Sequence, residues 1–148
     1  MNGYTDYERQ SQAIRAQNIE ILDTFQSWLH EKNLSESTIR KHRGNIDFYI
    51  NEFLLYEEPK RPADGVDEVR LFLGYWFIRK AMWANETSIR SNAASLKKFY
   101  DFMLEHGKVT SDAVKELKET IKEELPDWIE TVKRYDDPCV ALEDVWGW

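Results

Sequence analysis

The chain of 148 residues contains a single cysteine, Cys139, which excludes an internal disulfide. No segment approaches the roughly 18 apolar residues that span a bilayer, and the polar residues 1–17 contain no apolar signal-peptide core. We therefore expect a cytoplasmic protein that does not engage a membrane. One cysteine and three scattered histidines cannot build a structural zinc site, and no glycine-rich phosphate loop is present. We expect no metal, no cofactor and no small-molecule substrate.

Positive charge is in deficit, because the net charge is −7. Residues 105–148 hold 12 acidic and 6 basic residues, so this third of the chain carries −6 and the remainder only −1. An acidic protein is not expected to bind nucleic acid indiscriminately. Because the acidity is concentrated near the C-terminus, a local basic face elsewhere remains compatible with the composition.

Aromatic residues make up 14% of the chain, which favours an ordered domain with a real core. Apolar residues recur at helical spacing, so we predict an all-α protein. The predicted helices cover about 19–32, 36–56, 67–83, 86–105 and 111–125, followed by a short helix from Pro126. Ser35 and Asn85 are predicted N-caps, Thr110 or Ser111 caps the fifth helix, and Gly107 suits the end of the fourth. The helix over 67–83 is apolar nearly all round and is predicted to be central and buried.

A short motif occurs twice, fifty positions apart: Glu36-Ser37-Thr38-Ile39-Arg40 returns as Glu86-Thr87-Ser88-Ile89-Arg90. The register continues, because both helices carry apolar residues at matching positions: Ile46, Tyr49, Ile50, Phe53 and Leu54 pair with Leu96, Phe99, Tyr100, Met103 and Leu104. Other residues are predicted to point away from these faces: Arg40, Lys41, Gly44, Asn45 and Phe48 on one helix, and Arg90, Ser91, Ala94, Ser95 and Lys98 on the other, with Lys97 at the edge. His42, on the apolar face, is interpreted as a hydrogen-bonded packing residue.

Residues 21–109 resemble the N-terminal core-binding domain of tyrosine recombinases, the phage-integrase group. The family pattern begins with Phe, Leu and Ser-x-x-Thr-Ile, matched by Phe25, Leu29 and Ser35-Glu36-Ser37-Thr38-Ile39. Its second half is matched by Ser88-Ile89, Leu96, Phe99-Tyr100 and Gly107, while His42 stands where the family usually has tyrosine. The resemblance implies a SAM-like four-helix bundle. We therefore expect an N-terminal arm (1–18), a core-binding domain (19–109), a C-terminal helical extension (110–134) and a tail (135–148).

In that family the second and fourth helices lie toward the major groove of duplex DNA. The resemblance therefore implicates eight residues in DNA binding: Arg40, Lys41, Arg43, Asn45, Arg90, Ser91, Lys97 and Lys98. Gly44 and Ala94 occupy the same position in the two repeats. Small residues there would let another surface approach the backbone closely, or would equally permit helix–helix packing.

The catalytic part of a recombinase is not expected here. In the family it is a separate domain with a His-x-x-Arg element and a tyrosine nucleophile, but about 40 residues follow Val109 and none of the three histidines begins His-x-x-Arg. We predict a non-catalytic duplex DNA-binding domain that serves a mobile element as an accessory factor or competes with a full recombinase.

The alternative is a protein-interaction or dimerisation module that keeps the fold without binding DNA. A narrow apolar stripe on the fifth helix suits a partner helix, either in a homodimer or in a recombinase: Val114, Leu117, Ile121 and Leu125. Trp146 and Trp148 in the tail either anchor a partner or fold back on the domain. An enzyme with an unrecognised site is a weaker alternative, because no convergent polar cluster is evident.

Overall fold

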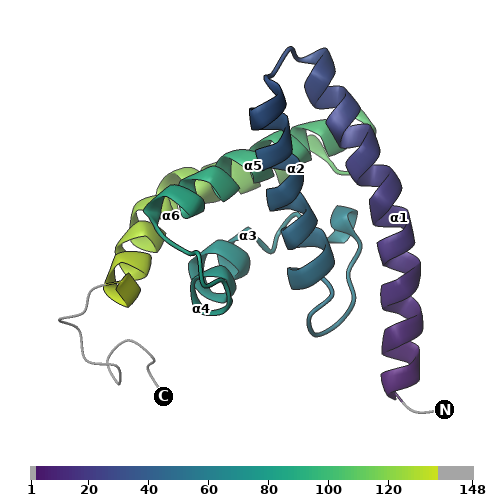
Figure 1. Ribbon diagram of the computed structural model, residues 1–148, viewed down its shortest axis with the longest axis horizontal. Helices are drawn as coiled ribbons and strands as arrows, with labels where there is room; N and C mark the ends of the chain where they lie inside the picture. The colour runs from purple at the N-terminus through teal and green to yellow at the C-terminus, as the bar shows by residue number, and fades with distance from the viewer. Residues whose placement is uncertain (1–2, 137–148) are drawn as a thin grey trace.

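The computed structural model describes residues 3–136 and confirms the all-α class, with no strand in this range (Figure 1). Four long helices are α1 (Gly3–Glu31), α2 (Glu36–Phe48), α5 (Glu86–Glu105) and α6 (Ser111–Asp136). Between α2 and α5 the chain forms short elements: a π-helical turn η1 (Tyr49–Phe53), a 3-10 turn η2 (Pro62–Asp64), α3 (Val69–Leu71), a second π-helical turn η3 (Phe72–Trp76) and α4 (Phe77–Lys80). No helix in the described range is both long and apolar enough to cross a membrane.

The predicted N-caps of the two repeat helices are confirmed, whereas the first of these helices, predicted over 36–56, ends at Phe48 and continues as η1 to Phe53. The Ser35 hydroxyl accepts a hydrogen bond from the Thr38 amide at 3.3 Å, and the Asn85 side chain accepts one from the Ser88 amide at 2.8 Å. The Ser88 hydroxyl also accepts from the Asn85 amide, which completes a capping box. At the other end, Gly107 has a φ of 68°, the left-handed conformation that favours glycine after a helix. Both copies of the motif therefore begin a helix by the same local chemistry.

The expectation of an N-terminal arm over residues 1–18 is wrong, because α1 is already helical from Gly3. Its N-terminal half is docked on the domain: the Tyr7 hydroxyl donates to the Leu55 carbonyl, and the Asn18 amide donates to the Asn51 side chain at 2.8 Å. Asn18 is fully buried. Because polar side chains make these contacts, the sequence of this segment shows no apolar periodicity from which a helix could be predicted.

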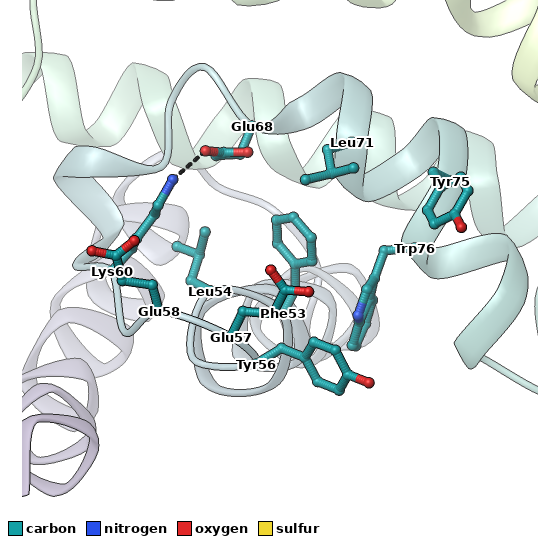
Figure 2. Close-up of a pocket in the computed structure, with 10 residues that line it drawn as sticks. All are labelled: Phe53, Leu54, Tyr56, Glu57, Glu58, Lys60, Glu68, Leu71, Tyr75 and Trp76. Carbon is teal, nitrogen blue, oxygen red and sulfur yellow. Dashed lines mark hydrogen bonds and ion pairs between the residues drawn. The ribbon is translucent and has the colours of Figure 1, made fainter. Parts of the chain in front are cut away.

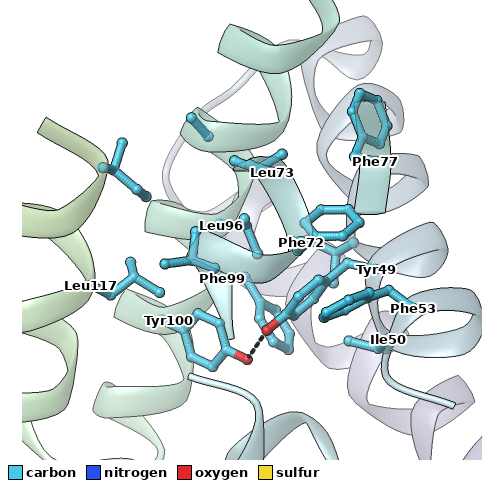
Figure 3. Close-up of a cluster of buried hydrophobic side chains, with 14 of the residues drawn as sticks. Tyr49, Ile50, Phe53, Phe72, Leu73, Phe77, Leu96, Phe99, Tyr100 and Leu117 are labelled. Atoms are coloured by element: carbon cyan, nitrogen blue, oxygen red, sulfur yellow. Dashed lines mark hydrogen bonds between the residues drawn. The ribbon is translucent and has the colours of Figure 1, made fainter. Parts of the chain in front are cut away.

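The core lies where η1, η3 and α5 meet, and aromatic rings fill it (Figure 3). Tyr49 and Tyr100 are both fully buried, with hydroxyl oxygens 3.0 Å apart. Tyr49 donates to the Gly65 carbonyl at 2.6 Å, and Tyr100 donates to the Pro62 carbonyl at 2.8 Å. Burial raises the pKa of both phenols, so they remain neutral donors. These two hydrogen bonds to carbonyl oxygens hold the loop around η2 against the core.

The segment predicted as one buried helix over 67–83 is helical without a break from Val69 to Lys80, where α3, η3 and α4 follow one another. It is not buried all round, because Leu71 is 51% and Tyr75 is 54% exposed. Phe48, predicted to point outward from α2, packs edge-on against Trp83 with ring centroids 5.1 Å apart. The apolar surface of this segment is therefore divided between the core, the outer face of α2 and solvent.

The C-terminal helix corrects two further expectations. It runs unbroken through Pro126, where a new helix was predicted. Proline removes the hydrogen bond to the Lys122 carbonyl, but both residues are exposed, so water can bind that oxygen. α6 also contributes Trp128 and Val132 to the core, so residues 110–134 are part of the domain rather than an extension. The tail beyond residue 136, with Cys139, Trp146 and Trp148, lies outside the described residues.

Candidate nucleic-acid interface

The two repeat helices cross at a polar seam, which links α2 to α5. Asn45 donates from its side-chain amide to the hydroxyls of Ser91 at 3.0 Å and Ser95 at 2.9 Å. The Ser95 hydroxyl also lies 2.7 Å from Nδ1 of His42. Ser95, predicted to face outward, is fully buried, whereas the interpretation of His42 as a hydrogen-bonded packing residue is confirmed. The structure therefore places Asn45 and Ser91 in a helix–helix contact.

Arg43 and Arg90 also have partners within the chain. Arg43 donates to Asp23 at 2.9 Å and to Gln26 at 2.8 Å, which ties α2 to α1. Arg90 pairs with Glu86 at 3.0 Å, and the same carboxylate pairs with Lys133 of α6 at 3.1 Å. Hydrogen bonds from Lys133 and then Arg90 lower the pKa of Glu86. Half of the eight predicted DNA-binding residues thus take part in intramolecular contacts.

The other half forms no ion pair with any residue of the described chain: Arg40 and Lys41 on α2, and Lys97 and Lys98 on α5. Arg40, Lys41 and Lys97 are exposed and Lys98 is half-buried. Burial first, and then the charges of Lys98 and Lys41, lower the pKa of His42. Both lysines therefore lie close to the seam, one on each of the crossing helices.

Gly44 and Ala94 lie exposed on the same two helices. A Cβ built on Gly44 would meet no atom within 4 Å, so this glycine is not required by the packing of one helix on another. The structure thus decides between the two interpretations of Gly44 given by the sequence: its backbone faces open space. We define the seam face as Arg40, Lys41, Gly44, Ala94, Lys97 and Lys98.

The apolar stripe predicted to bind a partner is not open to one. Val114, Leu117 and Ile121 are at most 3% exposed and belong to the core, and Leu125 is half-buried against it. The ion pair between Lys118 and Asp101, at 2.7 Å, holds α6 along α5. The stripe was predicted to bind a partner helix, but in the structure it packs into the core of its own chain.

Within the described range, no group of three or more His, Cys, Asp or Glu side chains converges as metal ligands do. Compared with family models, with curated proteins and with solved structures, the chain gives no match. What is established is therefore an all-helical domain whose repeat helices meet at a polar seam. These two helices carry four cations that form no ion pair with the described chain, and two of them, Lys41 and Lys98, lie close to the seam.

Proposed function

We propose that the chain binds duplex DNA through the seam face and does not cut it. The observation that carries the proposal is the set of four cations that form no ion pair with the described chain: Arg40, Lys41, Lys97 and Lys98. Most contacts between proteins and DNA go to phosphate oxygens, and unpaired lysine and arginine side chains are the usual donors. Cations already paired with carboxylates would have to give up those contacts first.

The small residues of the seam face support the same proposal. Gly44 has open space above its backbone, and Ala94 is exposed at the equivalent position of the second repeat. A phosphate backbone can approach a helix closely where side chains are short. Lys41 and Lys98 would then contact phosphates on the two sides of the crossing, and Arg40 would reach toward the base edges.

The resemblance to the recombinase core-binding domain extends the proposal to a four-helix SAM-like arrangement and to a role beside a recombinase. The protein would act as an accessory factor or a competitor for its site, in the cytoplasm. Asn45, Ser91, Arg43 and Arg90 would act indirectly, because they position α2 and α5. Binding of this kind weakens as the salt concentration rises, because each phosphate contact releases counterions from the DNA.

The test is a titration of a fluorescein-labelled duplex followed by anisotropy at several salt concentrations. Four phosphate contacts predict a slope of about −3.6 for the logarithm of the association constant against the logarithm of salt concentration. Lys41→Glu with Lys98→Glu should lower the affinity and reduce the slope by about 1.8. The matched control, Lys115→Glu with Lys122→Glu, removes two exposed lysines of α6 that also lack ion pairs in the described chain.

Equal losses in the two double variants would show that only net charge matters, which would sink the proposal. So would the absence of binding at roughly 100 micromolar protein, the weak end of non-specific affinities. The protein-interaction module is then the remaining alternative. Its original support, the stripe on α6, is buried in the structure.

A further inference from the structure

Two π-helical turns face each other on the side of the domain formed by η1 and η3. The Phe53 ring of η1 lies 5.0 Å from the Phe72 ring and 5.3 Å from the Trp76 ring of η3. π-helical turns are rare and occur frequently at functional sites, because the widened backbone re-aims side chains. The space beside these two turns is therefore a candidate binding site.

That space is a cavity of about 220 Å³ (Figure 2). Phe53 and Leu54 lie on one side, and Leu71, Tyr75, Trp76 and Tyr56 complete its apolar lining. Sites for drug-sized ligands measure roughly 300–1,000 Å³. The cavity is smaller than that range, so it suits one side chain of a partner better than a metabolite.

Several apolar residues that line the cavity are unusually exposed to solvent. Tyr56, Leu71 and Tyr75 are 50%, 51% and 54% exposed, and they are three of the six large apolar residues that the described chain leaves exposed. A gathering of exposed apolar side chains around a hollow is typical of an interaction surface. We call these residues and the cavity between them the aromatic groove.

The groove carries negative charge at its rim. Glu57 and Glu58 are exposed and form no ion pair within the described chain, whereas Glu68 pairs with Lys60. The aromatic rings also attract cations: the Arg79 guanidinium lies 3.8 Å from the Tyr75 ring centroid, and the Lys80 ammonium lies 5.2 Å from that of Tyr56. These two cations belong to the chain itself and lie over the rings, and neither forms an ion pair with Glu57 or Glu58.

A donor without an acceptor lies beside the cavity. The indole nitrogen of Trp76 is buried but has no hydrogen-bond partner. Figure 2 shows it on the edge of the ring that faces the cavity. A buried donor without an acceptor costs the free chain a hydrogen bond that the unfolded chain makes with water. A ligand that brings a carbonyl oxygen to this position would recover that cost.

We propose that the aromatic groove binds an arginine of a partner protein, presented on a segment with apolar neighbours. The planar guanidinium packs against the exposed aromatic rings and donates to the carboxylate of Glu57, which Figure 2 shows beside Phe53. The carboxylate of Glu58 lies on the Lys60 side of the cavity and adds negative charge there. A backbone carbonyl of the same segment accepts the hydrogen bond of Trp76, and an apolar neighbour covers Leu71. This site is separate from the seam face and does not depend on DNA binding.

The probe is the blocked tripeptide acetyl-Leu-Arg-Leu-amide, titrated into the ¹⁵N-labelled full chain and followed by two-dimensional NMR. The Trp76 indole signal is assigned as the one that disappears in Trp76→Phe. We expect a saturable shift of this signal with the arginine peptide, and a much smaller one with acetyl-Leu-Gln-Leu-amide. Glu57→Gln with Glu58→Gln should weaken binding about fivefold, because it removes the ion pair with Glu57 and the nearby charge of Glu58.

The matched control is Glu119→Gln with Glu123→Gln, which removes the same charge from exposed residues of α6. It should leave the affinity for the peptide unchanged. Equal weakening by both double variants, equal binding of the glutamine peptide, or an unmoved Trp76 signal at millimolar peptide would each overturn the proposal. A duplex DNA titration distinguishes the two sites, because DNA on the seam face should leave the Trp76 signal in place.

Discussion

At the scale of the residue, His42 shows how a side chain can serve packing and still respond to pH. It is 7% exposed, and its Nδ1 atom lies 2.7 Å from the Ser95 hydroxyl in the seam between α2 and α5. Burial and then the charges of Lys98 and Lys41 lower its pKa below the usual 6.5, so the neutral imidazole is the form that the fold accommodates.

The stability of the domain should therefore fall in acid because of His42. The unfolded chain takes up this proton as the pH drops through 6.5, whereas the folded chain resists it. The contribution of His42 is fully present above that pH and is lost between it and the lower folded-state pKa. Urea unfolding measured by circular dichroism from about pH 5 to about pH 8 should show a smaller acid loss in His42→Gln than in the natural chain.

His30→Gln is the control, because His30 is exposed at the end of α1. This variant should retain the full acid loss of the natural chain. If His42→Gln and the natural chain lose stability in parallel, the seam is not the origin of the pH dependence.

At the scale of the element, the two glycines Gly44 and Gly74 have opposite surroundings. Nothing lies within 4 Å of a Cβ on Gly44, on the exposed side of α2. On Gly74, in η3, a Cβ would lie 2.6 Å from the indole nitrogen of Trp128, which is buried in α6. Gly74 is what allows η3 and α6 to pack closely.

Gly44→Ala should stabilise the domain by about 1 kcal/mol, because alanine loses less backbone freedom in a helix and meets no clash here. Gly74→Ala should destabilise it by about 1–3 kcal/mol, because Trp128 cannot move without disturbing the core. Thermal unfolding of the two variants measures both effects. Destabilisation by Gly44→Ala would contradict the open environment of this glycine.

The sequence predicts a helix correctly where all of its apolar residues pack against the same core. α5 was predicted from Glu86 to Glu105, as observed, because its apolar face meets only the core. The burial of the segment from Val69 to Lys80 was predicted wrongly, because its apolar residues are divided between the core, the contact with α2 and the aromatic groove. That groove was missed for the same reason, since its lining comes from two segments that no local pattern connects.

The candidate interface was predictable only in part, because a sequence indicates which face a residue occupies but not which partner it meets. Arg40 and Lys41 were predicted to point outward, and both are exposed. Arg43 was assigned to DNA, although Asp23 and Gln26 of α1 bind its guanidinium. Those partners lie about twenty positions away in the chain, with no local signal for the contact.

At the scale of the whole molecule, α6 completes the core. Its residues Val114, Leu117, Ile121 and Val132 are buried against the rest of the chain, and ion pairs with Asp101 and Glu86 fix its course along α5. A helix that supplies this much apolar contact cannot be separated from the domain without exposing it.

Leu117→Ala should therefore reduce the free energy of unfolding by about 2–5 kcal/mol, the usual cost of truncating a buried leucine. Leu125→Ala, at a half-buried position of the same helix, should cost less. Denaturant unfolding measures both values, and light scattering should report the same mass for both variants and the natural chain. A natural dimer that Leu117→Ala converts into a stable monomer would contradict the intramolecular role of this stripe.

The contact between Asn45 and Ser95 has a further consequence for the molecule. These two residues occupy the same position in the two repeats, fifty places apart, and they bind each other at 2.9 Å. Contact between equivalent positions is the signature of a two-fold interface between identical subunits. Here it occurs within one polypeptide, between equivalent residues of α2 and α5. Lys41 and Lys98 lie on these two helices, so a ligand placed over the contact would meet positive charge from both copies of the repeat.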